Sequence, residues 1–108
     1  MANSRIVNTP SQAIPQSGTT HTQRTISSTA IALLASSLAN DTTHVLMQVT
    51  GANVRATFDG ATDPTTSLGF VYIDGSTGYL TRKMAQACKM IRDDSTDAVV
   101  EIQQLNYL

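Results

Sequence analysis

Few residues in this 108-residue chain could carry out catalysis. It has two histidines, His21 and His44, and a single cysteine, Cys88. Nucleophilic catalysis by Ser or Cys needs a His base and an acid that orients it, and the sequence contains no Gly-x-Ser-x-Gly turn. Cys88 lies among apolar residues at helical spacing, which is typical of a small buried side chain. The sequence therefore predicts no catalytic residues and a protein that is not an enzyme.

Ligand-binding motifs are also scarce. Zinc would need clustered Cys and His, which the chain lacks. Asp59 and Asp63 flank one loop and could offer carboxylates to calcium, but such residues far more often form Asx turns. The glycine-rich segment 74–78 lacks the Gly-Lys-Ser or Gly-Lys-Thr of a phosphate-binding loop. We therefore expect no metal and no cofactor.

The charge balance argues against a basic nucleic-acid binder and against a charged disordered tail. Seven Lys and Arg against eight Asp and Glu give a net charge of −1, and only 14% of residues are charged. The only local basic cluster, within residues 82–92, is expected to form a solvated or salt-bridged edge. The sequence contains no apolar run long enough for a transmembrane helix and no apolar segment typical of a signal peptide near its start. We expect synthesis in a reducing cytoplasm, with no nucleic-acid and no membrane partner.

The composition instead favours strands and turns. Sixteen Thr and ten Ser make up about a quarter of the chain, and these residues suit exposed strand faces and turns. Residues 1–23 contain no aromatic residue, and fifteen of them are Ser, Thr, Asn, Gln, Gly or Pro. We predict an extended or disordered N-terminal arm over residues 1–23 and one domain over residues 24–108. The arm could lie on a neighbouring subunit through Ile6, Val7 and Ile14.

Short alternating apolar runs predict the strands of that domain. They cover residues 22–28, 30–34, 44–50, 53–58, 70–73 and 98–105. The two-residue link Gly51-Ala52 predicts a β-hairpin between residues 44–50 and 53–58. Within residues 80–92, a short helix over Arg82 to Ala87 and a strand over Cys88 to Arg92 both fit the pattern. The fold class expected is mainly β, a small antiparallel, jelly-roll-like β-sandwich, with a small barrel as the alternative.

The rhythm of strands and turns over residues 22–105 resembles small virion structural proteins of tailed bacteriophages. In these proteins a strand ending in Gln precedes a strand of alternating small residues, a Thr-containing loop, a Gly-led strand and a Gly turn. The segments that carry the resemblance are Val45 to Gly60, Asp63-Pro64-Thr65, Gly69-Phe70, Asp74-Gly75 and Ile91-Arg92.

The resemblance implies a non-enzymatic component of the virion, assembled in the host cytoplasm. We expect a capsid decoration or cement protein that binds the outer shell and stabilises contacts between major capsid subunits. A head-to-tail connector, tail or fibre-base protein is the alternative, and a host-glycan-binding module is a lesser one. The expected partners are the major capsid protein or another virion protein, and further copies of the chain in a trimer or dimer. Expected contact residues are the arm residues Ile6, Val7 and Ile14, together with Arg55, Arg82 and Lys83.

Overall fold

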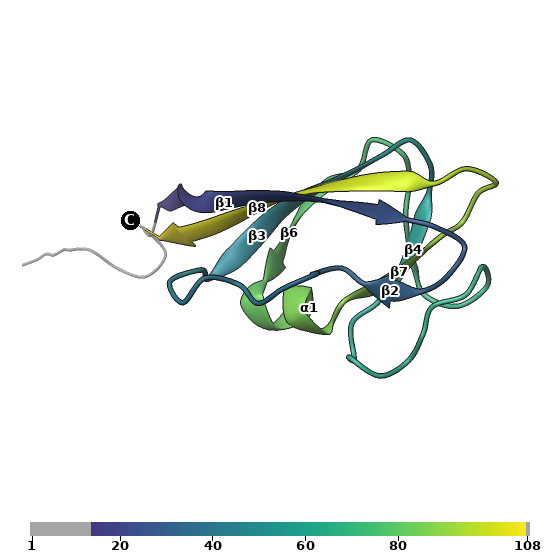
Figure 1. Cartoon of the computed structure of the whole chain (residues 1–108), viewed down its shortest axis with the longest axis horizontal. Helices are drawn as coiled ribbons and strands as arrows, with labels where there is room; N and C mark the ends of the chain where they lie inside the picture. The colour runs from purple at the N-terminus through teal and green to yellow at the C-terminus, as the bar shows by residue number, and fades with distance from the viewer. Residues whose placement is uncertain (1–13, 108) are drawn as a thin grey trace, which may run out of the picture.

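The computed structural model describes residues 14–107, which form two four-stranded antiparallel sheets and one short helix (Figure 1). The elements are β1 (Pro15–Ile26), β2 (Ile31–Ala32), β3 (His44–Thr50), β4 (Val54–Thr57), β5 (Phe70–Tyr72), β6 (Thr77–Thr81), α1 (Arg82–Ala87), β7 (Lys89–Arg92) and β8 (Ala98–Tyr107). One sheet has the order β1-β8-β3-β6, and the other has the order β2-β7-β4-β5. The predicted small antiparallel β-sandwich is confirmed.

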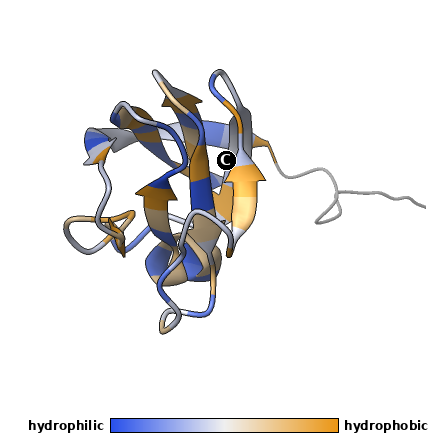
Figure 2. Ribbon diagram, turned by 90° about the vertical axis from the view of Figure 1, so that its right-hand side faces the viewer, coloured by the Kyte–Doolittle hydropathy of each residue, from blue (hydrophilic) through white to orange (hydrophobic). Residues whose placement is uncertain are grey.

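The core lies between the two sheets and follows the alternation of the strands. In β3, Val45, Met47 and Val49 are buried, and Val54 and Ala56 of β4 face them from the other sheet. Figure 2 shows hydrophobic and hydrophilic residues alternating along several strands. Because successive side chains of a strand point to opposite faces, the polar residues of these strands cover the outer surfaces.

The first strand begins earlier than composition predicted. β1 starts at Pro15 and pairs with β8 as far as Ile26, with an irregularity between Ser17 and His21. The predicted boundary at residue 23 is therefore wrong, since residues 15–23 belong to the sandwich. Only Ile26 of this strand is buried, so β1 is held mainly by backbone hydrogen bonds to β8. Backbone hydrogen bonds do not require apolar residues at particular positions, so the sequence pattern did not reveal this part of the strand. Ile6 and Val7 lie outside the described residues.

The predicted hairpin is also wrong, because β3 and β4 lie in different sheets. β3 already has β8 on one side and β6 on the other, which leaves it no edge for β4. Gly51, with a φ of 88°, turns the chain from one sheet to the other. Its N–H donates to the Asp74 carboxylate at 3.0 Å, and the Asn53 N–H donates to Asp94 at 2.9 Å. Apolar residues on both strands thereby face each other across the core.

The two alternatives for residues 82–92 both occur, one after the other. α1 covers Arg82–Ala87, and the hydroxyl of its N-cap Thr81 accepts a hydrogen bond from the Met84 N–H at 3.2 Å. The strand β7 then runs from Lys89 to Arg92. Within residues 14–107, no helix is long and apolar enough to cross a membrane.

Candidate interaction site

The strand β5 is an exposed, apolar sheet edge. Within the described chain it pairs with β4 alone. Phe70 is 69% exposed, Val71 47%, and Ile73, directly after the strand, 62%. Sheet edges are usually protected by charged residues, by proline or by a covering segment, and residues 70–73 include no charge and no proline. This edge is therefore suited to contact another protein segment.

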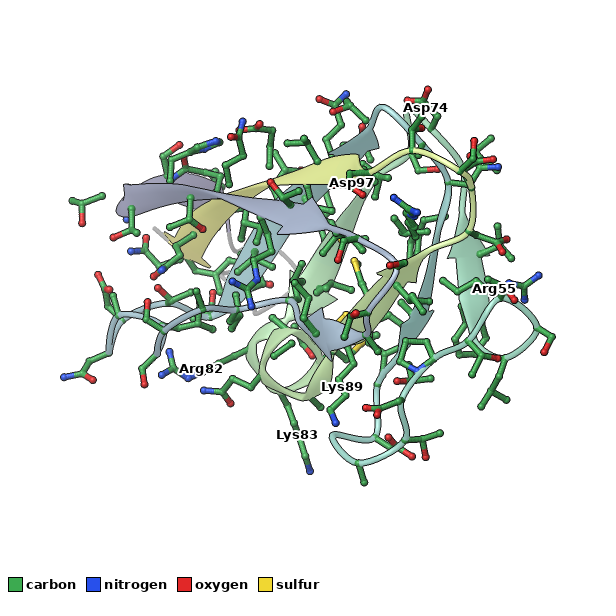
Figure 3. All side chains as sticks on the ribbon, turned by 45° about the vertical axis from the view of Figure 1, so that its right-hand side comes forward. Arg55, Asp74, Arg82, Lys83, Lys89 and Asp97 are labelled. Atoms are coloured by element: carbon green, nitrogen blue, oxygen red, sulfur yellow. The ribbon has the colours of Figure 1, made fainter. Side chains whose placement is uncertain are left out.

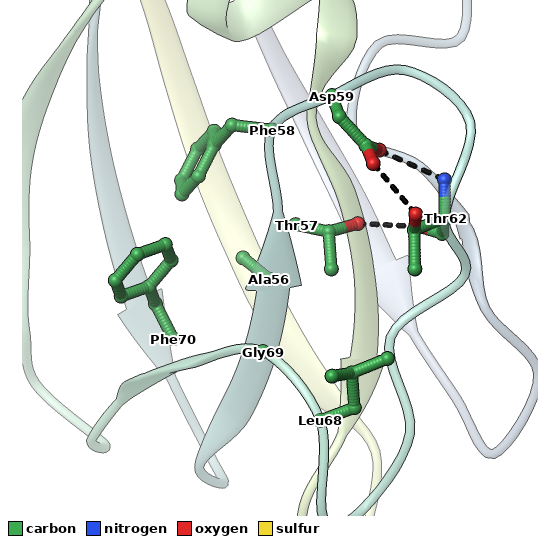
Figure 4. A pocket seen from close by; sticks show the side chains of 8 residues that line it. All are labelled: Ala56, Thr57, Phe58, Asp59, Thr62, Leu68, Gly69 and Phe70. Atoms are coloured by element: carbon green, nitrogen blue, oxygen red, sulfur yellow. Dashed lines mark hydrogen bonds between the residues drawn. The ribbon is translucent and has the colours of Figure 1, made fainter.

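An open groove of about 520 Å³ lies beside this edge (Figure 4). Its lining residues are Ala56, Thr57, Phe58, Asp59, Thr62, Leu68, Gly69 and Phe70. The last β4–β5 pair joins Ala56 to Phe70, and β4 continues beyond it. At Gly69, whose φ is 125°, the chain turns sharply, and a Cβ there would lie 3.0 Å from the Ala56 carbonyl oxygen. The groove thus lies between the end of β4 and the loop that leads into β5.

The aromatic residues near the groove belong to the core side of the sheet but are incompletely covered. Phe70 and Tyr72 pair with Ala56 and Val54, which are buried. The ring centroids of Phe58 and Phe70 are 6.0 Å apart. In β6, the edge of the facing sheet, Gly78 pairs with buried Met47 and has open space where a side chain would lie. The core therefore stays partly open at this side of the sandwich.

Asp59 adds one fixed negative charge to the wall of the groove. Its carboxylate accepts hydrogen bonds from the Ala61 N–H, the Thr62 N–H and the Thr62 hydroxyl, at 3.0, 2.8 and 2.6 Å. The Thr62 hydroxyl and then the backbone N–H groups lower the pKa of Asp59 to about 2. These bonds form the Asx turn considered for this loop, whereas Asp63 pairs with Lys89 at 2.9 Å. Residues 14–107 contain no group of three His, Cys, Asp or Glu placed to hold a metal ion.

Of the three cations predicted as contact residues, Arg82 and Lys83 are neighbours at the start of α1, whereas Arg55 lies apart from them on β4 (Figure 3). Arg55 pairs with Asp93 at 3.2 Å and donates to the Gly69 carbonyl at 3.2 Å, which ties β4 to the start of β5. Arg82 donates to the carbonyls of Ala39 and Thr42 and so anchors the loop before β3.

The other predicted contacts lie elsewhere on the surface. Lys83 projects from α1 into solvent, and Ile14 is 57% exposed beside the start of β1. The groove residues Phe58, Leu68 and Phe70 were missed by sequence reasoning. The signal that could have found them is the uninterrupted apolar run after Gly69, since a surface strand normally alternates.

The residues considered for catalysis have structural partners. His44 is buried between Tyr107, whose ring is stacked at 4.9 Å, and Tyr79, at 5.8 Å. His21 bonds to Glu101 on the outer face of the sheet at 2.8 Å. Burial raises the pKa of the Cys88 thiol to about 12, so the group stays protonated. The predicted burial of Cys88 is confirmed.

No family model, curated protein or solved structure matches this chain. The chemistry of the groove is apolar, with a strand edge on one side and one carboxylate on its wall. Such a site can bind an extended segment with apolar side chains, through backbone hydrogen bonds and burial.

Proposed function

We propose that this protein is a non-enzymatic structural protein of a tailed-bacteriophage virion. Within that class we propose a capsid decoration or cement protein, which binds the outer shell and stabilises contacts between neighbouring major capsid subunits. The observation that carries the proposal is the exposed apolar edge of β5 with its groove. The resemblance of residues 22–105 to such proteins in the order of strands and turns supports it.

The surface chemistry supports a role in protein contacts. A net charge of −1 provides little long-range repulsion between subunits. The outer face of the first sheet carries the amide and hydroxyl side chains of Gln23, Gln48, Thr50 and Gln103 around the His21–Glu101 pair, and such side chains can hydrogen-bond to a neighbour. A domain of this size buries only ~60% of its unfolded surface, so contacts with partners add usefully to its stability.

The position of the protein in purified particles tests the proposal. We expect electron cryomicroscopy to find this sandwich at repeated positions on the outer shell, and quantitative mass spectrometry to find its copy number in proportion to the major capsid protein. Density at a single vertex would instead identify a connector, tail or fibre-base protein. Absence from the particle would overturn the virion role altogether.

A further inference from the structure

The free edge of β5 can accept one more strand. β5 is the last strand of its sheet among residues 14–107, and its outer backbone edge faces away from β4. Strand addition joins an extended segment to such an edge by backbone hydrogen bonds, and the pockets beside the edge select its side chains. Here the groove would select apolar side chains, and the charged Asp59 would favour a cation nearby.

One segment of this chain outside the described residues has these properties. Ser4 to Thr9 reads Ser-Arg-Ile-Val-Asn-Thr, and Ile6 and Val7 are β-branched residues that favour strands. Arg5 supplies a cation directly before them. Pro10 follows the segment, and because proline has no N–H to donate, it ends a strand.

The segment cannot reach the groove of its own copy. The described chain begins where β8 ends, whereas β4 lies toward the opposite end of the molecule (Figure 1). β1 alone, with twelve residues, is ~40 Å long. Ile6 is eight residues before Ile14, which is at most ~28 Å of extended chain. β1 and β5 are also edges of different sheets, so a path to the groove has to pass around the sandwich. The occupant must therefore come from another copy.

Direct pairing of the β5 strands of two copies would bury less surface than strand addition. β5 has three residues, too few to bury the ~1,200 Å² or more that is typical of a stable interface. A six-residue segment covers both the edge and the groove, and a reciprocal exchange between two copies doubles the area buried.

We propose that Ser4–Thr9 of one copy adds as a strand to the free edge of β5 in a second copy. In this arrangement Ile6 and Val7 contact the groove and the adjoining edge, and Arg5 lies near Asp59. The contact goes beyond the proposed function, since it concerns association between copies and would exist on a capsid or away from one.

Disulfide trapping between two full-length variants tests this contact directly. One variant carries Val7→Cys, and the other carries Leu68→Cys in the groove. The native Cys88 does not interfere, because it is buried. After mixing and oxidation with diamide, we expect a disulfide-linked pair containing one chain of each variant. Tyr107→Cys is the matched control for Leu68→Cys, since Tyr107 is 50% exposed and Leu68 is 49% exposed; with this control we expect at least about tenfold less of the mixed pair.

Two outcomes would overturn the proposal. One is equal trapping by Leu68→Cys and Tyr107→Cys. The other is a link within a single chain, independent of protein concentration, when Val7→Cys and Leu68→Cys are placed in the same molecule. The second outcome would show that the segment binds its own copy.

Sedimentation velocity supplies a readout that needs no new cysteine. We expect the full chain to show a sedimentation coefficient that rises with concentration. Val71→Lys places a charge on the edge, and Ile6→Asp places one in the segment; each should weaken association at least about tenfold. Met84→Lys, on α1, is the control and should leave association unchanged. A full chain that stays monomeric throughout, or variants that associate as the parent does, would contradict the exchange.

Discussion

At the scale of single residues, two isoleucines differ in how deeply their side chains are buried. Ile102 is 1% exposed in the core, whereas Ile73 is 62% exposed beside the β5 edge. Ile102→Ala should lower the free energy of unfolding by ~2–5 kcal/mol, because it removes buried methylene groups and leaves a cavity. Ile73→Ala, the matched control, should change it by less than about 0.5 kcal/mol. Urea unfolding followed by circular dichroism measures both, since the chain has no Trp for fluorescence. Equal losses would contradict the assigned core.

The His21–Glu101 pair gives a prediction about pH. The Glu101 hydrogen bond, followed by that of Gln103, raises the pKa of His21 above its usual value, and the His21 hydrogen bond lowers the pKa of Glu101. The stabilisation from His21 is therefore complete below its unfolded pKa and is lost as pH rises through its raised folded pKa. At acid pH it is lost as Glu101 becomes protonated through its lowered pKa.

NMR titration of the His21 ring checks this pair. In the parent protein we expect a midpoint above 6.5, and in Glu101→Gln a shift back toward 6.5. An unchanged His21 midpoint in Glu101→Gln would show that the carboxylate does not hold the proton on the ring.

At the scale of elements, two glycines on edge strands or next to them have opposite requirements. Gly69 has a φ of 125°, and an added Cβ would lie 3.0 Å from the Ala56 oxygen. Gly69→Ala should therefore destabilise the protein by ~1–3 kcal/mol through backbone strain. Gly78 in β6 has open space around it, so Gly78→Ala should stabilise by ~0.5–1 kcal/mol, as Ala is favoured over Gly in a strand. Thermal unfolding of the two variants side by side measures the difference, and a stable Gly69→Ala would contradict the geometry of the turn into β5.

Which residues form strands was easier to predict from the sequence than which strands pair with each other. The alternation of Val45, Met47 and Val49 located β3 with its correct bounds. A strand that is buried on one face alternates apolar and polar residues, so its position can be recognised in the sequence. The pairing of β3 depends on which neighbours occupy its two edges. The link between β3 and β4, residues 51–53, is short enough for a hairpin but here crosses from one sheet to the other. The groove was missed for a related reason: it lies between the end of β4 and the loop that leads into β5, and the pairing of these two strands could not be derived from the alternation within either one.

At the scale of the whole molecule, the polar character of the chain is distributed unevenly. Most residues of β1 are exposed and polar. Of the eight exposed large apolar side chains within residues 14–107, four lie in β5, directly after it or in the loop before it, namely Leu68, Phe70, Val71 and Ile73. With a net charge of −1, electrostatic repulsion between copies of the chain is weak. Contact through the exposed apolar edge of β5 is therefore weakly opposed. Association and folding stability should therefore be linked in this protein.

That linkage gives a prediction for the intact chain. A partner that binds only the folded protein adds to its unfolding free energy by an amount that grows with partner concentration. The midpoint of thermal unfolding should therefore rise when protein concentration is raised a hundredfold, and circular dichroism in cells of different path length can follow it. Val71→Lys should remove most of the concentration dependence while leaving the dilute midpoint near that of the parent, because Val71 is 47% exposed on an edge strand. Midpoints of the parent that coincide at all concentrations would show that the exposed edge does not join copies of the chain.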